Sequence, residues 1–163
     1  MKYLLFILPL FTLTMVTAQQ PQPKPVELQK TNDQLVWLGW NEGYEKAVKD
    51  HKIVLVDAYT DWCGWCKRMD RDTYAQPDVI AKINSRFIPI KFNPEIPEQN
   101  YKIGDQVFTN QQLFGLLTQG KSTGFPTIYY IFPQKRSITV DAGYKGPADF
   151  LVILGKMIEE DSR

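Results

Sequence analysis

The chain has 163 residues, of which 44% are hydrophobic, and its 19 lysines and arginines nearly balance its 18 aspartates and glutamates. This length is enough for one domain with its own core. The balance of charge gives no electrostatic reason to expect a nucleic acid or an acidic membrane surface as a partner.

The first 18 residues predict a cleaved signal peptide. One basic residue, Lys2, precedes an apolar run from Leu4 to Val16, and the segment ends at the small residue Ala18. The run is shorter than the roughly 20 apolar residues of a membrane-spanning helix, which favours a signal peptide. The alternative interpretation is an uncleaved membrane anchor. No cysteine lies at the cleavage site, which argues against a lipoprotein. Without Lys2 the mature chain is formally neutral, and we expect a periplasmic or secreted protein with no permanent membrane anchor.

Residues 19–34 are predicted to form an extended N-terminal spacer or a frayed terminus, because prolines alternate with polar residues at their start. We expect residues 35–163 to form one folded domain. Its first half alternates between strand and helix patterns. Strands are predicted over 35–40, 53–59 and 87–92. Helices are predicted over 41–50, from 63 past 69, and from 77 past 83. Asn41 is a possible cap of the first helix. This order is typical of an α/β domain with a largely parallel sheet, in which residues 35–40 form an edge strand.

The second half opens with a long connection, residues 93–124, in which only 110–117 shows a helical pattern. Connections of this length usually carry function or are disordered.

Two strands, 127–132 and 138–141, follow and flank a short polar turn, which predicts an antiparallel hairpin. A last helix is expected to start at Pro147. Its apolar stripe would pack on the sheet and consists of Phe150, Leu151, Leu154, Met157 and Ile158.

Cys63 and Cys66 are the only cysteines in the chain, and they lie at the start of a predicted helix, directly after an apolar strand. A zinc site needs about four ligands, and the chain adds only one histidine, His51. Covalent haem attachment requires a histidine directly after the second cysteine, where this chain has Lys67. Two interpretations are left, a dithiol that cycles with a disulfide and a passive bridge. A bridge over so small a loop would stabilise the fold little.

Within a redox dithiol, Cys63 is predicted to be the attacking thiol. Unpaired N–H groups and the helix dipole lower the pKa of a cysteine at a helix N-terminus, and Lys67 would add to this effect. Cys66, deeper in the helix, would be the resolving thiol. Trp62 and Trp65 flank the pair, and we expect them to form a peptide-docking surface, with ordinary packing as the alternative.

Asp57 is an acid within an otherwise apolar predicted strand, where an unpaired carboxylate is costly. Burial raises the pKa of a carboxyl, so Asp57 is predicted to accept and return a proton as Cys66 changes state. Lys91, in another apolar strand, is its expected partner. The alternative is a structural pair that moves no proton.

The stretch Val56-Asp57-Ala58-Tyr59-Thr60-Asp61-Trp62-Cys63-Gly64-Trp65-Cys66-Lys67 resembles the active-site strand and helix of the thioredoxin superfamily. The likeness includes the acid before the first cysteine. It covers most of residues 35–158, and it matches Lys91 to the family's buried lysine and Gly143 to the glycine after its last strand.

The segment Gly124-Phe125-Pro126-Thr127 is similar to the special proline loop of that superfamily. The resemblance implies a cis bond between Phe125 and Pro126. It also implies that Pro126 lies against the cysteines and leaves backbone groups free to pair with an extended substrate.

Two features depart from thioredoxin itself. Trp65 stands where thioredoxin has proline, which resembles instead secreted or periplasmic thioredoxin-like proteins and the C-terminal domain of the transmembrane thiol–disulfide interchange proteins. Residues 93–124 are longer than the equivalent connection in thioredoxin, and we expect them to rim the substrate groove. The predicted fold is therefore α/β and thioredoxin-like, with a central mixed sheet, helices on both faces and a long insertion before the cis-proline loop.

We predict an exported thiol–disulfide oxidoreductase, acting as reductase, isomerase or oxidase. Its expected partners are protein thiols and disulfides of exported proteins and an upstream thiol donor, and we expect a monomer with no metal and no cofactor beyond the Cys63–Cys66 pair. The expected catalytic residues are Cys63, Cys66, Asp57 and Lys91. The expected substrate-binding residues are Trp62, Gly64, Trp65, Phe125, Pro126 and Thr127. The alternative function is a non-catalytic binding or chaperone-like module on the same scaffold.

Overall fold

A computed structural model describes residues 34–97, 99–121 and 123–163. The predicted signal peptide and all but the last residue of the predicted spacer lie outside these ranges. Within the described ranges, none of the helices combines the length and the apolar character needed to cross a bilayer.

A four-stranded mixed sheet forms the centre of the domain, with strand order β2-β1-β5-β6. β1 (Ile53–Ala58) pairs in parallel with β2 (Phe87–Phe92) and antiparallel with β5 (Thr127–Phe132). β5 in turn forms the predicted hairpin with β6 (Ser137–Ala142). Every residue of β1 and β5 is buried, as expected of central strands covered on both faces.

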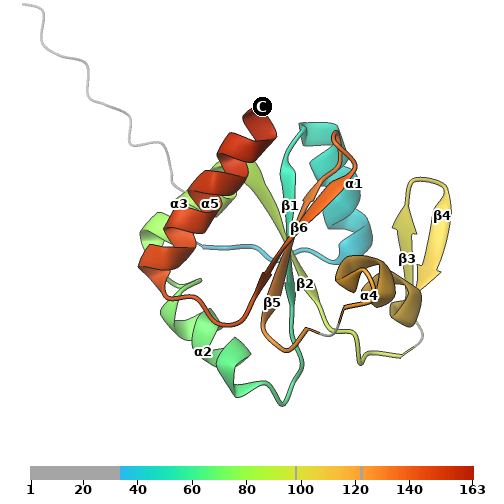
Figure 1. Cartoon of the computed structure of the whole chain (residues 1–163), viewed down its shortest axis with the longest axis horizontal. Coiled ribbons are helices and arrows are strands. Elements are labelled where there is room, and N and C mark those ends of the chain that lie inside the picture. The colour runs from blue at the N-terminus through green and yellow to red at the C-terminus, as the bar shows by residue number, and fades with distance from the viewer. Residues whose placement is uncertain (1–33, 98, 122) are drawn as a thin grey trace, which may run out of the picture.

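Helices cover both faces of the sheet, as Figure 1 shows with the sheet close to edge-on. α1 (Trp40–Asp50) and α4 (Asn110–Thr118) pack on one face, and α2 (Gly64–Asp72), α3 (Pro77–Arg86) and α5 (Pro147–Ser162) pack on the other. The predicted helices and the predicted fold class are confirmed.

The predicted edge strand over residues 35–40 is wrong. Only Leu38 forms a bridge, to Ile90 of β2, and its N–H donates to the carbonyl of Pro89. Pro89 has no N–H with which to extend this ladder towards Val36, and α1 already begins at Trp40. Because this strand is absent, β1 and β2 are the one parallel pair within the described part of the sheet, which is therefore not largely parallel.

The predicted cap of α1 is also wrong. The helix begins one residue earlier, with Gly39 at the N-cap position. The Asn41 side chain instead binds a neighbouring strand: its Nδ2 donates to the carbonyl of Asn100, and its Oδ1 accepts from the N–H of Lys102.

That strand belongs to a second, two-stranded sheet that the sequence patterns did not predict. β3 (Asn100–Ile103) and β4 (Gln106–Thr109) form a hairpin within the long connection, and it lies beside α1 in Figure 1. Its turn uses Gly104 at φ +59°, a backbone conformation that glycine adopts without steric cost. α4 then begins directly after β4 with a capping box between Thr109 and Gln112.

Candidate active site

A disulfide joins Cys63 and Cys66 at the N-terminal end of α2. Cys63 is the N-cap residue, and its Sγ accepts a hydrogen bond of 3.0 Å from the N–H of Cys66. The two residues are similarly buried, with 4% and 3% of their surface exposed. Exposure therefore does not distinguish the two cysteines, but the N-cap position of Cys63 does. A thiolate at Cys63 would be stabilised by the same N–H bond and by the positive end of the helix dipole.

Trp62 connects the cysteine pair to the long connection and to the proline loop. The indole is 68% exposed, and its Nε1–H donates to both carboxylate oxygens of Glu95, at 3.1 and 2.9 Å. Its ring meets the ring of Phe125 edge-on, with centroids 6.1 Å apart. Phe125 is in turn stacked on Phe114 of α4 at 6.2 Å. Two parts of the connection, the segment after β2 and α4, thus reach the predicted substrate-binding residues.

Trp65 lies in a different group of side chains. It is 54% exposed, and its ring packs 5.5 Å from that of Tyr144, which follows β6. The guanidinium carbon of Arg68 lies over both rings, 5.1 Å from the centroid of Trp65 and 5.2 Å from that of Tyr144. Such a cation–π arrangement fixes the cation beside the indole.

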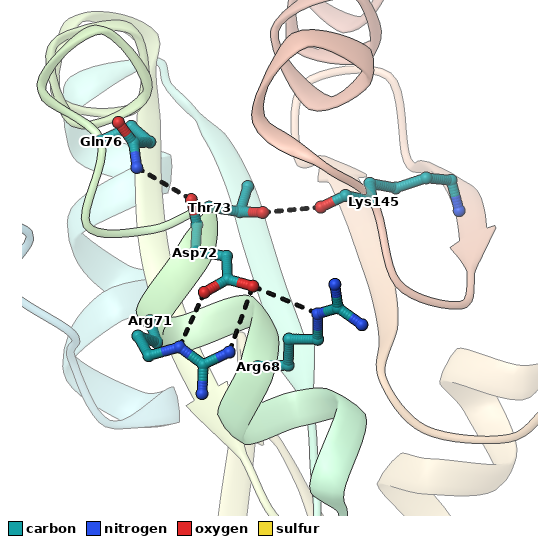
Figure 2. A network of polar contacts seen from close by, with 6 residues as sticks. All are labelled: Arg68, Arg71, Asp72, Thr73, Gln76 and Lys145. Atoms are coloured by element: carbon teal, nitrogen blue, oxygen red, sulfur yellow. Dashed lines mark hydrogen bonds and ion pairs between the residues drawn. The ribbon is translucent and has the colours of Figure 1, made fainter.

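Polar contacts at the C-terminal end of α2 hold the Arg68 side chain of this group (Figure 2). Asp72 accepts from Nε of Arg68 at 3.2 Å and from both Nε and Nη2 of Arg71. Next to it, the Thr73 hydroxyl donates to the carbonyl of Lys145 at 2.7 Å. Helix α2 is thereby joined to the turn that carries Tyr144.

The Phe125–Pro126 peptide bond is cis, as the resemblance implied. The carbonyl of Pro126 accepts from the N–H of Gly143, which has φ +85°, at 2.8 Å, and the Thr127 hydroxyl donates to the carbonyl of Gly124 at 2.7 Å. Among the described residues, no partner binds the backbone N–H or C=O of Phe125. Backbone groups of this kind are the ones with which an extended peptide pairs in strand addition.

Asp57 and Lys91 form the expected pair in neighbouring strands. The Lys91 ammonium nitrogen lies 2.5 Å from Oδ2 of Asp57 and 2.6 Å from Oδ1 of Asp70 on α2. Burial raises the pKa of Asp57 above its ordinary value, although the Lys91 charge opposes this. Burial would lower the pKa of Lys91, but the carboxylates of Asp57 and Asp70 outweigh it, so that the pKa is raised and the lysine stays charged.

Aromatic rings enclose the lysine. Its ammonium lies 4.7 Å from the ring centroid of Trp37, 5.0 Å from that of Tyr59 and 5.4 Å from that of Tyr74. A surface cleft lined by Trp37, Tyr74, Asp70 and Lys91 connects this group to solvent. Asp57 itself is 1% exposed, so the lysine stands between the buried acid and water.

The structure does not join Asp57 directly to the cysteines. Its second oxygen, Oδ1, is buried without a hydrogen-bond partner among the described residues, and neither cysteine is bonded to it. Lys67 is exposed, and within the same described ranges its ammonium makes no ion pair. Gly64 is exposed beside the disulfide and has open space where a side chain would begin.

The sequence patterns did not single out several residues in these contacts, among them Asp70, Glu95, Arg68 and Tyr144. Asp70 lies one helical turn after Cys66, a spacing that could have placed it beside the site. The other three meet the tryptophans through contacts that no local pattern specifies. Among the described residues, no group of three or more His, Cys, Asp or Glu side chains is arranged to hold a metal ion.

Comparison with known proteins agrees with this fold. The family model Thioredox_DsbH, described as a protein of unknown function, DUF255, matches residues 19–152. A DsbH oxidoreductase structure superposes with a TM-score of 0.58 at 20% identity, covering 88% of this chain and 95% of that one. The oxidised C-terminal domain of DsbD from Neisseria meningitidis superposes with a TM-score of 0.51 at 25% identity, covering 71% of this chain and 90% of that one. The resemblance to the thioredoxin superfamily is confirmed.

Curated relatives match over shorter segments. Protein disulfide-isomerase 5-2 of Arabidopsis thaliana is 27% identical over 55 residues, which are 34% of this chain and 12% of that protein. The chain matches only 10% of the length of the first curated relatives.

Proposed function

The chain belongs to the Thioredox_DsbH family, and from this premise we propose that it is an exported thiol–disulfide oxidoreductase acting on disulfides of other exported proteins. The observation that carries the proposal is the Cys63–Cys66 disulfide at the N-terminus of α2, with its Sγ···H–N bond. A passive bridge has no need of a thiolate-stabilising position, whereas a nucleophile does.

In the reducing direction, the reduced protein starts the reaction as a thiolate at Cys63. The Cys63 thiolate attacks one sulfur of a substrate disulfide, which forms a mixed disulfide and releases the other substrate sulfur as a thiolate. The Cys66 thiolate then attacks Sγ of Cys63 and expels the second substrate thiolate. The protein is left with the Cys63–Cys66 disulfide, and two electrons have passed to the substrate. An upstream thiol donor would restore the dithiol.

Asp57 is proposed to take the proton from Cys66 when that thiol becomes a nucleophile. Burial raises the pKa of Asp57 above its ordinary value, which favours the protonated carboxyl that a proton acceptor must form. Since Asp57 makes no hydrogen bond to the cysteines among the described residues, the proton would pass through an intervening water, and Lys91 would position the carboxyl through the 2.5 Å bond. The alternative in which Asp57 and Lys91 are only a structural pair predicts no effect of Asp57 on the pH profile of the resolving step.

Insulin reduction by dithiothreitol tests the proposal. The wild-type protein should accelerate precipitation of the insulin B chain, and Cys63→Ala should abolish the acceleration. A binding or chaperone-like module with a passive bridge would leave the rate of reduction unchanged. In that case the proposal is wrong.

The direction of electron flow is tested by the reduction potential of the cysteine pair in glutathione or dithiothreitol buffers. A value at or below about −230 mV, yet above the roughly −300 mV of inert structural bridges, indicates a reductase. A value of about −120 to −180 mV indicates an oxidase or an isomerase. Export is tested separately, by N-terminal sequencing of the protein recovered outside the cytoplasm, which should start after Ala18.

A further inference from the structure

We propose that the two sides of the cysteine pair carry opposite charges and that the site selects an extended substrate segment by the order of its charges. The preferred segment has a basic residue on one side of its disulfide-bonded cysteine and an acidic residue on the other. This inference rests on the proposed function, since it concerns which disulfides the Cys63 thiolate attacks.

The acidic side is formed at Trp62. Glu95 is exposed, and both of its oxygens face the single Nε1–H of the indole, which leaves most of their acceptor capacity unused. Its own backbone N–H donates to Oδ1 of Asn93 at 2.9 Å, which fixes the start of the connection. Asp61, exposed next to Trp62, adds a second negative charge. A lysine or arginine of a substrate that packs on Trp62 therefore meets carboxylates.

The basic side is formed at Trp65. Arg68 lies over Trp65 and Tyr144, and half of its side chain is exposed. It shares the carboxylate of Asp72 with Arg71, so that two cations face one anion and a net positive charge is left (Figure 2). An aspartate or glutamate of a substrate that packs on Trp65 therefore meets a guanidinium that is already fixed in place.

The proline loop lies between the two sides. Phe125 contacts Trp62, and the carbonyl of Pro126 binds the N–H of Gly143, the residue before Tyr144, which contacts Trp65. A peptide that pairs with the backbone N–H and C=O of Phe125 would thus run between the two tryptophans. Charge complementarity identifies the occupant as a peptide whose charges of opposite sign flank its cysteine.

The inference is tested with three short synthetic peptides, each holding one cysteine in a mixed disulfide with 2-mercaptoethanol. One has lysine before and glutamate after the cysteine, the second has the reverse order, and the third has alanine at both positions. The two charged peptides have the same net charge, so they differ only in order. The second-order rate constant for reduction by the reduced protein is measured for each peptide.

We expect the wild-type protein to favour one charged order over the other by about fivefold, because an exposed ion pair contributes up to about 1 kcal/mol. Glu95→Gln and Arg68→Gln should each reduce this ratio, and the double variant Glu95→Lys, Arg68→Glu should invert it. Raising the salt concentration to about 1 M should bring the ratio close to one, because the Debye length is then only about 3 Å and exposed charges are screened.

Matched controls are Arg86→Gln and Asp105→Asn, which remove exposed charges of the same signs elsewhere in the fold. Both should keep the wild-type ratio. Equal rates for the two charged orders in the wild-type protein, with the alanine peptide also reduced, would overturn the inference and leave the proposed function intact. Failure to reduce any of the three peptides would instead count against the proposed function.

Discussion

Lys91 holds Oδ2 of Asp57 at 2.5 Å while its ammonium keeps a second partner, Asp70, at 2.6 Å. The lysine is therefore not left unpaired when Asp57 gains a proton. Removing one partner of an isolated buried ion pair leaves an uncompensated charge, which is strongly destabilising. Asp70 prevents this for Lys91, so Asp57 can change its protonation state at low cost, as the proposed mechanism requires.

Asp57→Asn should stabilise the protein at neutral and alkaline pH. The folded-state pKa of Asp57 is raised, so its contribution to stability is fully present below the unfolded-state pKa of 3.8 and is lost as the pH rises through the folded-state value. Asparagine removes this loss, and we expect the free energy of unfolding at pH 8 to rise by about 1–3 kcal/mol. Urea unfolding of the variant and the wild type at pH 4 and pH 8 measures this difference in the free energy of unfolding. The gain should shrink at pH 4, and a variant less stable than the wild type at pH 8 would contradict the raised pKa.

Lys91→Met should have the opposite effect. Without the ammonium, the buried Asp57 carboxylate has no cation and its pKa should rise further. We expect a loss of about 3 kcal/mol at pH 8 and a smaller loss at pH 4, because less of the Asp57 carboxyl is charged at the lower pH. The same urea titrations measure this. Asp70→Asn is the control: Asp70 is exposed, and its removal should cost clearly less than the loss of Lys91. A loss for Lys91→Met that does not change with pH would show that the lysine acts by packing alone.

The two cysteines should differ in covalent trapping of substrates. Cys66→Ala leaves the Cys63 thiolate able to attack but removes the thiol that resolves the mixed disulfide. This variant should accumulate disulfide-linked partners, whereas Cys63→Ala should accumulate far fewer. Non-reducing electrophoresis of alkylated extracts provides the measurement. The double variant Cys63→Ala, Cys66→Ala gives the background. Equal accumulation by the two single variants would remove the assignment of roles.

Local patterns predicted the parts of the fold that depend on local physics. The apolar runs of β1 and β5 identify central strands, and Pro77 and Pro147 mark helix starts. The β3–β4 hairpin was missed because each strand has only four residues and five of these eight residues are exposed. Its one signal is the Gly104-Asp105 turn between two alternating segments.

The central residues of the candidate site could be singled out from the sequence for a similar, local reason. The cysteines, Asp57 and Lys91 occupy positions that stand out against their own strand or helix. Glu95 and Tyr144 could not be predicted, because their roles depend on how loops from distant parts of the chain approach the two tryptophans. Positions of this kind are set by tertiary packing, which no spacing rule describes.

Phe114 should influence substrate choice without changing the redox chemistry. Its ring is stacked on Phe125 at 6.2 Å and packs 6.3 Å from Phe92, so it supports the loop that carries Pro126. Among the described residues its ring contacts are with Phe92 and Phe125, and the Sγ···H–N bond of Cys63 is made by the Cys66 backbone. Phe114→Ala should therefore raise KM for a protein disulfide such as insulin about three- to tenfold, the effect of losing one aromatic contact of about 0.5–1.5 kcal/mol.

The reduction potential of Phe114→Ala should stay that of the wild-type protein, and so should its rate with a small disulfide that does not reach the loop. Val107→Ala is the matched control, since this side chain is an exposed apolar residue of β4 in the same insertion. It should change neither KM nor the potential. If Phe114→Ala lowered only the thermal stability, with KM unchanged, the connection would have a structural role and would not rim the substrate groove. A changed potential would instead place Phe114 among the groups that tune the cysteines.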